Sequence, residues 1–211
     1  MDDALAYPLR GDHAETSLVA AWLCVLVHVL VVPVLPLVAL LGYVVSVLVL
    51  GSERDPPPFL ERTVLRQALG AAGIAIAYGA IPLVLALGTI RLLTETDEVP
   101  TGGGTFAVLV GSTAVLAILG VTAYLLPIAL ANYGRAGSIR AGFADIVSVA
   151  SHGAYFVGWA SGITLLLVGL ALSSALVSRG GVALVAGTLI GAYAVLVSSR
   201  RIGRGYAAGR R

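Results

Sequence analysis

The sequence predicts an all-α, polytopic bundle of transmembrane helices, and its composition and hydropathy are the first observations that support this fold class. Of the 211 residues, 58% are hydrophobic and only 11% are charged, whereas about 25% are charged in an average soluble domain. The mean hydropathy is +0.98, and a soluble domain of this size could not bury so much apolar surface. Intrinsic disorder is excluded as well, because it needs low hydrophobicity and high charge.

Four apolar stretches are long enough to cross a bilayer, since a helix needs about 20 apolar residues to span about 30 Å of hydrocarbon. None of them carries an Asp, Glu, Lys or Arg in its interior. They lie near residues 68–90, 105–131, 153–178 and 180–199.

A fifth apolar stretch, residues 17–50, is too long for one upright crossing. As a single helix it would measure about 50 Å. Pro33 and Pro36 interrupt its hydrogen-bond ladder near the middle. The stretch therefore forms either one tilted, kinked span or two short helices, near 17–32 and 34–50. The two-helix interpretation makes six crossings arranged as three hairpins, and the kinked span makes five.

The arginines orient this 17–199 transmembrane domain, because cytoplasmic loops are enriched in Lys and Arg. All 13 basic residues are arginines. With six crossings, one side of the membrane holds the polar, interfacial N-terminal segment 1–16, the connections near 51–66 and 132–152, and an Arg-rich tail, 200–211. On the other side of the membrane, the only basic residues are Arg91 and Arg179. With five crossings Arg10 changes sides, but the C-terminus stays cytoplasmic in both cases.

The cytoplasmic connections are expected to contain short interfacial helices. Residues 138–149 can form an amphipathic helix on the membrane surface, with Phe143 and Val147 towards lipid and Arg140 and Asp145 towards water.

Polar residues and prolines inside the apolar stretches are the candidate intramembrane sites. The simplest role for His28 is a hydrogen bond to a carbonyl freed by the proline bend, since a proton or metal role would need partners that the nearby sequence lacks. Prolines within a span kink the helix and free carbonyls, which hydroxyls such as those of Tyr78 or Thr122 can satisfy. The candidate positions are His28, Pro33, Pro36, Tyr78, Pro82, Tyr124 and Pro127.

Small residues four apart indicate close helix contacts in lipid. Gly158–Gly162 and Ala183–Gly187–Gly191 are examples. They favour packing within the bundle or, alternatively, a homodimer seam.

A series of short motifs extends along nearly the whole chain. In order they are Tyr7-Pro8-Leu9-Arg10, Gly42-Tyr43, Asp55-Pro56-Pro57-Pro58-Phe59, Tyr78-Gly79-Ala80-Ile81-Pro82, Tyr124-Leu125-Leu126-Pro127, Asn132-Tyr133-Gly134-Arg135-Ala136-Gly137, Ala141-Gly142-Phe143 and Arg201-Ile202-Gly203-Arg204-Gly205-Tyr206. This series resembles the domain of unknown function 4013 (DUF4013) family, multi-pass membrane proteins common in archaea. The resemblance implies an integral membrane protein with a cytoplasmic N-terminus, and it implies no activity.

The functional expectation is an uncharacterised, non-enzymatic integral protein of the cell membrane that organises partners or lipids. No catalytic constellation, cofactor motif or metal-ligand spacing is present, and a net charge of +2 is too small for a nucleic-acid footprint. The tail arginines can either fix topology alone or attract anionic headgroups. The alternative function is a small transporter or channel for a neutral or hydrophobic solute. The candidate lipid contacts are Arg200, Arg201, Arg204, Arg210 and Arg211.

Overall fold

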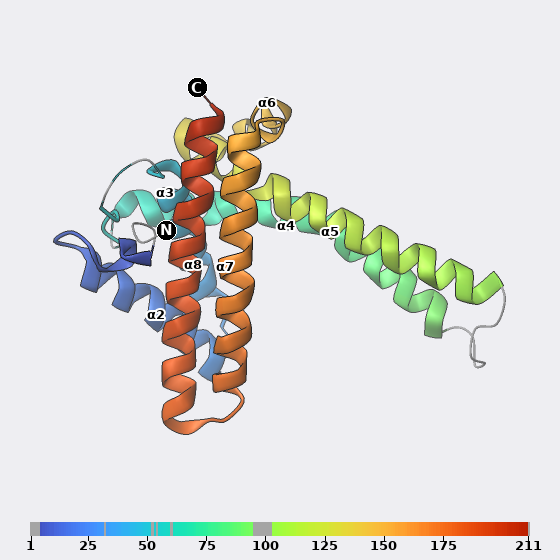
Figure 1. Cartoon of the computed structure of the whole chain (residues 1–211), viewed down its shortest axis with the longest axis horizontal. Helices are drawn as coiled ribbons and strands as arrows, with labels where there is room; N and C mark the ends of the chain where they lie inside the picture. The colour runs from blue at the N-terminus through green and yellow to red at the C-terminus, as the bar shows by residue number, and fades with distance from the viewer. Residues whose placement is uncertain are drawn as a thin grey trace.

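The computed structural model describes residues 5–31, 33–51, 53, 55–59, 61–94 and 103–210. In this part of the chain every regular element is a helix (Figure 1). The long helices are α2 (Ala14–Val31), α3 (Leu35–Val49), α4 (Arg62–Thr94), α5 (Gly103–Ala136), α7 (Gly153–Val177) and α8 (Gly181–Gly209). The short ones are η1 (Tyr7–Leu9), η2 (Ile139–Phe143) and α6 (Ile146–Ala150). Five of the long helices are long and apolar enough to cross a membrane, and α3 is a shorter apolar helix.

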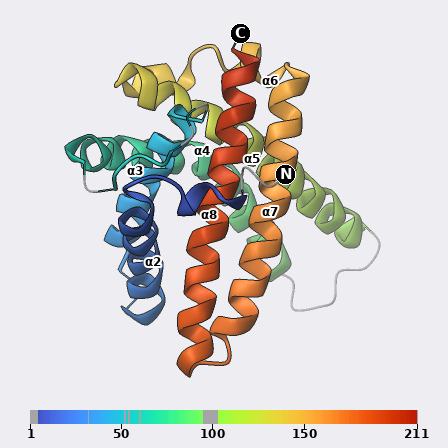
Figure 2. The same cartoon turned by 60° about the vertical axis from the view of Figure 1, so that its left-hand side comes forward.

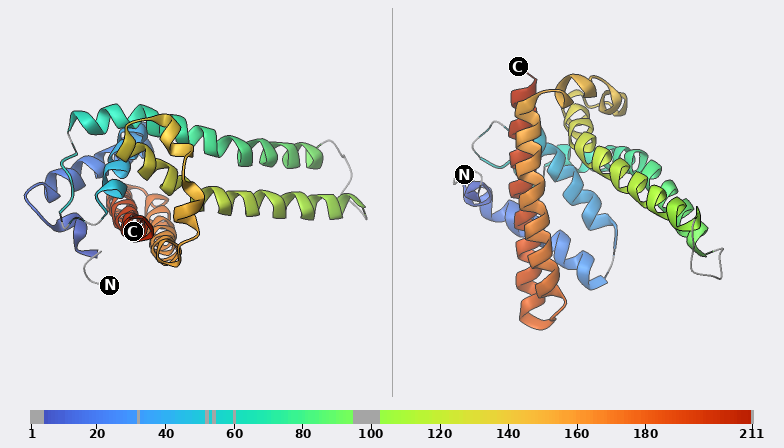
Figure 3. Two further views of the ribbon diagram at one scale, coloured as in Figure 1. Left: turned by 90° about the horizontal axis from the view of Figure 1, so that it is seen from above. Right: turned by 45° about the vertical axis from the view of Figure 1, so that its right-hand side comes forward.

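The six long helices pair in chain order into three hairpins. The right panel of Figure 3 shows the α2–α3 and α7–α8 turns towards one end of the molecule, and η2, α6 and the end of α8 at the other. The membrane-type helical bundle expected from composition is therefore present, with the expected pairing of consecutive helices.

Residues 17–50 form two helices rather than one kinked span. Ser17 Oγ, at the start of α2, and Tyr43 Oη, in the second half of α3, both donate to the carbonyl oxygen of Pro57, each at 3.1 Å. Both can reach one acceptor only because α3 folds back beside α2. Six helices thus run between the two ends of the bundle. With 15 residues, α3 is shorter than the roughly 20 residues of an ordinary span.

Helices α4 and α5 form a hairpin that leans away from the rest of the bundle (Figure 1). They contain 33 and 34 residues, or about 50 Å each at 1.5 Å per residue. The inner part of the hairpin joins the core, where Ala71, Ile74 and Ile128 are fully buried. The outer part exposes large apolar side chains such as Leu83 and Leu116. Such a surface suits lipid, and the length requires the hairpin to tilt in a bilayer of ordinary thickness.

Helices α7 and α8 lie side by side along their length (Figures 1 and 2). The close approach depends on glycine, because a Cβ placed on Gly158 would lie 2.7 Å from Gly205 Cα. Likewise, a Cβ on Gly162 would lie 3.0 Å from the Ser198 carbonyl oxygen, and one on Gly187 would lie 2.8 Å from that of Ser173. The small-residue motifs in this pair therefore serve packing within the chain.

Two boundaries differ from those expected. Helix α8 continues through Arg200 to Gly209, so residues 200–209 are not a separate tail; packing of this part of α8 against α3 and α7 extends the helix beyond its most apolar segment. The amphipathic helix expected over 138–149 is instead split into η2 and α6, because Asp145 has the left-handed backbone conformation (φ 52°). Arg54 and Arg211 lie outside the described residues.

Candidate functional site

The first candidate position, His28, makes a local contact. Its Nδ1 lies 3.1 Å from the carbonyl oxygen of Pro33, across the turn between α2 and α3. This is the local bond that a histidine beside a proline bend is expected to make. Pro36 lies within the first turn of α3, a position at which proline is compatible with a helix.

Tyr78 and Tyr124 anchor the connecting segment 137–152 to the bundle. Tyr78 Oη donates to the Gly142 carbonyl oxygen at 3.3 Å, and its ring stacks on Phe143. Tyr124 Oη donates to the Ala150 carbonyl oxygen at 2.6 Å. Both hydroxyls therefore cap a connection rather than repair a proline break, contrary to the role suggested for Tyr78.

The proline break in α5 is repaired from another helix. Pro127 has no N–H, so the Ala123 carbonyl loses its helical partner. Trp159 Nε1, on α7, donates to this carbonyl oxygen at 2.9 Å, and Tyr155 Oη donates to the neighbouring Tyr124 carbonyl oxygen at 2.6 Å. Since Tyr155 is fully buried, the two aromatic residues join α7 to α5.

An apolar cavity of about 340 Å³ lies beside Pro127, between α3, α5, α7 and α8. Its polar lining residues are Ser198 and Ser199, whose hydroxyls bond carbonyl oxygens of their own helix, in both cases that of Val195. The cavity therefore presents mainly hydrocarbon and suits an apolar group better than water or an ion.

The arginines near the end of α8 point in different directions. Arg200 is only 4% exposed; its Nη1 donates to the Leu50 carbonyl oxygen at 3.0 Å, and its guanidinium lies 4.5 Å from the centre of the Tyr7 ring. Burial raises the pKa of the Tyr7 hydroxyl, so Arg200 lies over a neutral phenol. Arg200 is therefore a structural cation, and the expectation that it contacts lipid headgroups is wrong, because it lies on the face of α8 that packs on α3 and η1.

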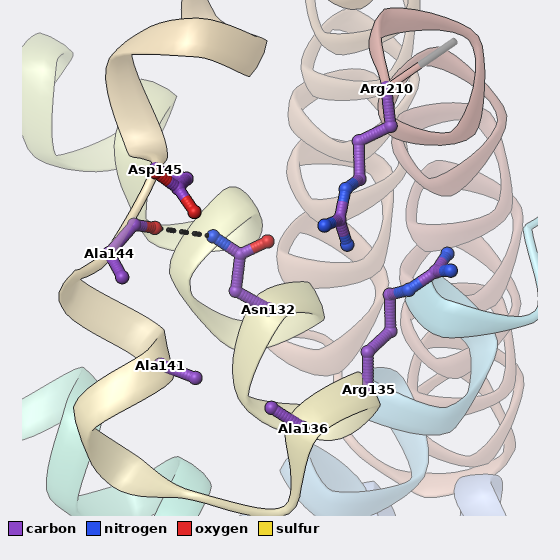
Figure 4. A pocket seen from close by; sticks show the side chains of 7 residues that line it. All are labelled: Asn132, Arg135, Ala136, Ala141, Ala144, Asp145 and Arg210. Atoms are coloured by element: carbon purple, nitrogen blue, oxygen red, sulfur yellow. Dashed lines mark hydrogen bonds between the residues drawn. The ribbon is translucent and has the colours of Figure 1, made fainter.

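Arg210 and Arg135 enter one open polar pocket of about 320 Å³ at the end of the bundle. Figure 4 shows Arg210 extending from α8 and Arg135 from the end of α5. In this view the Asp145 carboxylate lies next to Asn132, on the side away from the two arginines. Arg135, Arg210 and Asp145 are all exposed. The lining is completed by Ala136, Ala141 and Ala144.

Asn132 holds the pocket together. It is only 8% exposed; its Nδ2 donates to the Ala144 carbonyl oxygen at 2.8 Å, and its Oδ1 accepts from Tyr206 Oη at 2.6 Å. Arg210 Nη1 in turn donates to Tyr206 Oη at 3.1 Å. This chain of hydrogen bonds fixes α5, α8 and the 139–145 segment relative to one another, and it orients one of the two cations.

The electrostatics of the pocket favour a small anion. Two guanidinium groups and one carboxylate leave a formal charge of one positive unit. Guanidinium groups form charge-assisted hydrogen bonds to phosphate and carboxylate oxygens. An adjoining hollow of about 360 Å³ also includes Asn132, Asp145 and Arg210, and adds Ser148 and His152. Within the described residues, no group of three or more His, Cys, Asp or Glu is placed to hold a metal ion.

The sequence predicts Arg210 as a lipid contact but does not indicate its partners in the pocket. Asn132 and Arg135 belong to the Asn-Tyr-Gly-Arg motif at the end of an apolar span, and Asp145 lies in the next connection. The sequence feature that could have indicated the pocket is the amide side chain of Asn132, at the end of an apolar span. Nothing in the sequence, however, pairs residue 132 with residue 206.

The fold and the pocket define a multi-pass helical membrane protein with a basic pocket at one end. The chain belongs to the DUF4013 family of proteins of unknown function, whose model matches residues 25–178. The matched region contains Asn132, Arg135 and Asp145, whereas the arginines of α8 lie beyond it. No curated protein and no solved structure matches the chain.

Proposed function

We propose that this protein is a non-enzymatic integral protein of the cell membrane that binds anionic phospholipid headgroups at its cytoplasmic end and so organises lipids around itself. The observation that carries the proposal is the pocket lined by Arg135 and Arg210 together with Asn132. Its groups are suited to binding an anion.

The orientation follows from the distribution of arginines between the two ends of the bundle. Among the described residues, Arg91 and Arg179 lie near hairpin turns, and the remaining arginines lie towards the opposite end. Because basic residues concentrate in cytoplasmic loops, we assign the pocket and both chain termini to the cytoplasmic side.

The charge of the pocket fits a phospholipid. The phosphodiester of a phospholipid carries one negative charge, which balances the single net positive charge of Arg135, Arg210 and Asp145. The Asp145 carboxylate also offers an acceptor to a hydroxyl-bearing headgroup such as that of phosphatidylglycerol.

The pocket also lies beside a segment that is suited to the membrane interface, where lipid headgroups are found. The connecting segment that forms one of its walls exposes large apolar side chains, with Ile139 at 54%, Phe143 at 52% and Val147 at 80% exposure. Exposed apolar side chains beside basic ones are typical of a segment lying in the membrane interface.

The alternative function, transport of a neutral or hydrophobic solute, draws its support from the apolar cavity beside Pro127. Its two serines turn their hydroxyls to the carbonyl of Val195, so the cavity lends no support to a path for polar solutes. The charged groups of the Asn132 pocket support binding of a lipid headgroup better than the apolar cavity supports transport.

The test is a titration of the purified protein, in a neutral detergent, with short-chain phosphatidylglycerol and with short-chain phosphatidylcholine. Arg135→Gln and Arg210→Gln are each expected to weaken phosphatidylglycerol binding about fivefold, from about 1 kcal/mol per basic residue. Phosphatidylcholine binding should change less, because its headgroup carries a compensating positive charge.

Arg140→Gln is the matched control, since Arg140 is an exposed arginine of η2 that does not line the pocket. Equal losses for Arg140→Gln and Arg135→Gln would show a diffuse surface effect and would reject the pocket.

A further inference from the structure

Arg201 borders a groove on the surface of the α7–α8 pair. The groove has a volume of about 450 Å³, and its other lining residues are Val157, Ala160, Ser161, Thr164 and Leu165 of α7. Arg201 follows Arg200 by one position, about 100° around the helix. It therefore faces this groove, whereas Arg200 faces α3 and η1.

The groove is apolar apart from Arg201. The hydroxyl of Ser161 donates to the Gly158 carbonyl oxygen at 3.1 Å, and that of Thr164 donates to the Ala160 carbonyl oxygen at 2.8 Å. Both hydroxyls are thus engaged by the backbone of α7, and the groove presents a hydrocarbon surface beside a guanidinium group.

Arg201 Nε is buried and has no hydrogen-bond partner among the described residues. A buried donor on a charged group is costly to leave unpaired, and a cation near hydrocarbon is more costly still. An anion at the mouth of the groove would offset the charge of this guanidinium through its terminal nitrogens, the Nη donors.

The position of Arg201 along the helices is close to the end of the α7–α8 pair that carries the connections. A Cβ on Gly158 would lie 3.1 Å from the Arg201 carbonyl oxygen, and Gly158 is five residues from the start of α7 at Gly153. The Arg201 backbone is therefore about 8 Å from that end of α7. A long arginine side chain can extend its charge from this depth to the phosphate level. The groove continues from Val157 to Leu165, about 12 Å further towards the hairpin turn.

We propose that Arg201 and this groove bind one anionic phospholipid, with its phosphate on the guanidinium and an acyl chain along Val157, Ala160 and Leu165. The complementarity is twofold, because the guanidinium matches the phosphate and the apolar groove matches the chain. This site is separate from the Asn132 pocket, and neither depends on the other.

The test uses the full chain in phosphatidylcholine nanodiscs carrying a small fraction of spin-labelled phosphatidylglycerol or spin-labelled phosphatidylcholine. The ratio of the two association constants measures the preference for the anionic lipid. Arg201→Gln is expected to lower this preference severalfold. Arg179→Gln, which removes an exposed arginine at the opposite end of α7, should leave it unchanged.

A stability measurement separates the site from a general charge effect. Arg201→Met removes the unpaired charge, so in pure phosphatidylcholine its melting temperature should equal or exceed that of the wild type. Phosphatidylglycerol should raise the melting temperature of the wild type more than that of Arg201→Met, because a ligand stabilises the form that binds it. Equal rises would overturn the proposal.

Two further variants test what occupies the groove. Thr164→Trp fills the apolar part and should reduce retention of both spin-labelled lipids. Ala160→Cys, in a Cys24→Ala background, reports a second copy of the chain. Efficient Ala160→Cys dimer cross-linking in nanodiscs would show that protein covers the groove and would overturn the lipid assignment. The Arg135→Gln and Arg210→Gln variants should retain binding at Arg201, so failure of one site is distinguishable from failure of the other.

Discussion

A single residue in this bundle replaces the hydrogen bond that Pro127 removes from α5. Trp159 Nε1 donates to the Ala123 carbonyl oxygen left free by Pro127. In hydrocarbon no water can replace that donor. The aromatic residues at positions 155 and 159 are therefore structural, although their place near the start of an apolar span suggests interfacial anchoring.

Trp159→Phe is predicted to destabilise the protein by about 1 to 2 kcal/mol, the upper range for interhelical hydrogen bonds in membranes. The effect should shrink in a Pro127→Ala background, because residue 127 then supplies the N–H that the Ala123 carbonyl lacks. Denaturation by sodium dodecyl sulfate in mixed micelles would measure the free energy of unfolding of all four proteins. An unchanged cost of Trp159→Phe in the Pro127→Ala background would contradict this explanation of the bond.

Asn132 acts at the same scale, as the residue that assembles the candidate site. It links the Ala144 carbonyl to Tyr206, and Tyr206 orients Arg210. The orientation of Arg210 therefore depends on one buried amide, which lies 74 residues from Tyr206 in the sequence.

At the scale of elements, the closest pairing is between α7 and α8. It is possible because both helices carry glycine where they cross. Burial of apolar surface provides little attraction between helices in lipid, so the fit of small residues determines which faces meet. Other pairs use the same device less densely: a Cβ on Gly42 of α3 would lie 2.5 Å from the Val64 carbonyl oxygen of α4.

Gly158→Ala is predicted to destabilise the α7–α8 hairpin by about 1 to 3 kcal/mol, the usual cost of overpacking. The reason is that the new Cβ would lie 2.7 Å from Gly205 Cα. Gly79→Ala is the matched control, since a Cβ at that position of α4 has no neighbour within 4 Å. Thermal melting in detergent should show a loss for Gly158→Ala and none for Gly79→Ala. Equal behaviour of the two variants would refute close packing at Gly158.

At the scale of the whole molecule, the six long helices of the described residues form three hairpins, and η2, α6 and the end of α8 lie together at one end. The arginines concentrate at this end. The outer parts of α4 and α5 extend the molecule sideways and expose a broad apolar surface. This shape is compatible with a lipid surround, and the Asn132 pocket lies at the basic end.

Six crossings predict that Asp12 and Ser138 face the cytoplasm and Ser178 faces outside. Single cysteines at these positions, in a Cys24→Ala background, can be labelled in intact cells with a membrane-impermeant maleimide. We expect labelling at position 178 and protection at positions 12 and 138 until the membrane is permeabilised. Labelling at position 12 without permeabilisation would instead indicate five crossings.

The membrane class, the approximate positions of the spans and the segregation of arginines were determined by the sequence alone. These properties depend on local composition and on the length of helix needed to cross hydrocarbon, and both are readable from consecutive residues. The family resemblance was readable for the same reason, from motifs in linear order, and it is confirmed by the family match over residues 25–178.

The tertiary structure alone decided which polar groups meet. It folded residues 17–50 into two helices, turned Arg200 towards η1 and the end of α3 and Arg201 towards the groove beside α7, and joined Asn132 to Tyr206. Adjacent residues on a helix differ by about 100° in direction, so the role of each arginine depends on which helix packs against each face. That choice is made by contacts between segments far apart in the chain, and no local pattern encodes it.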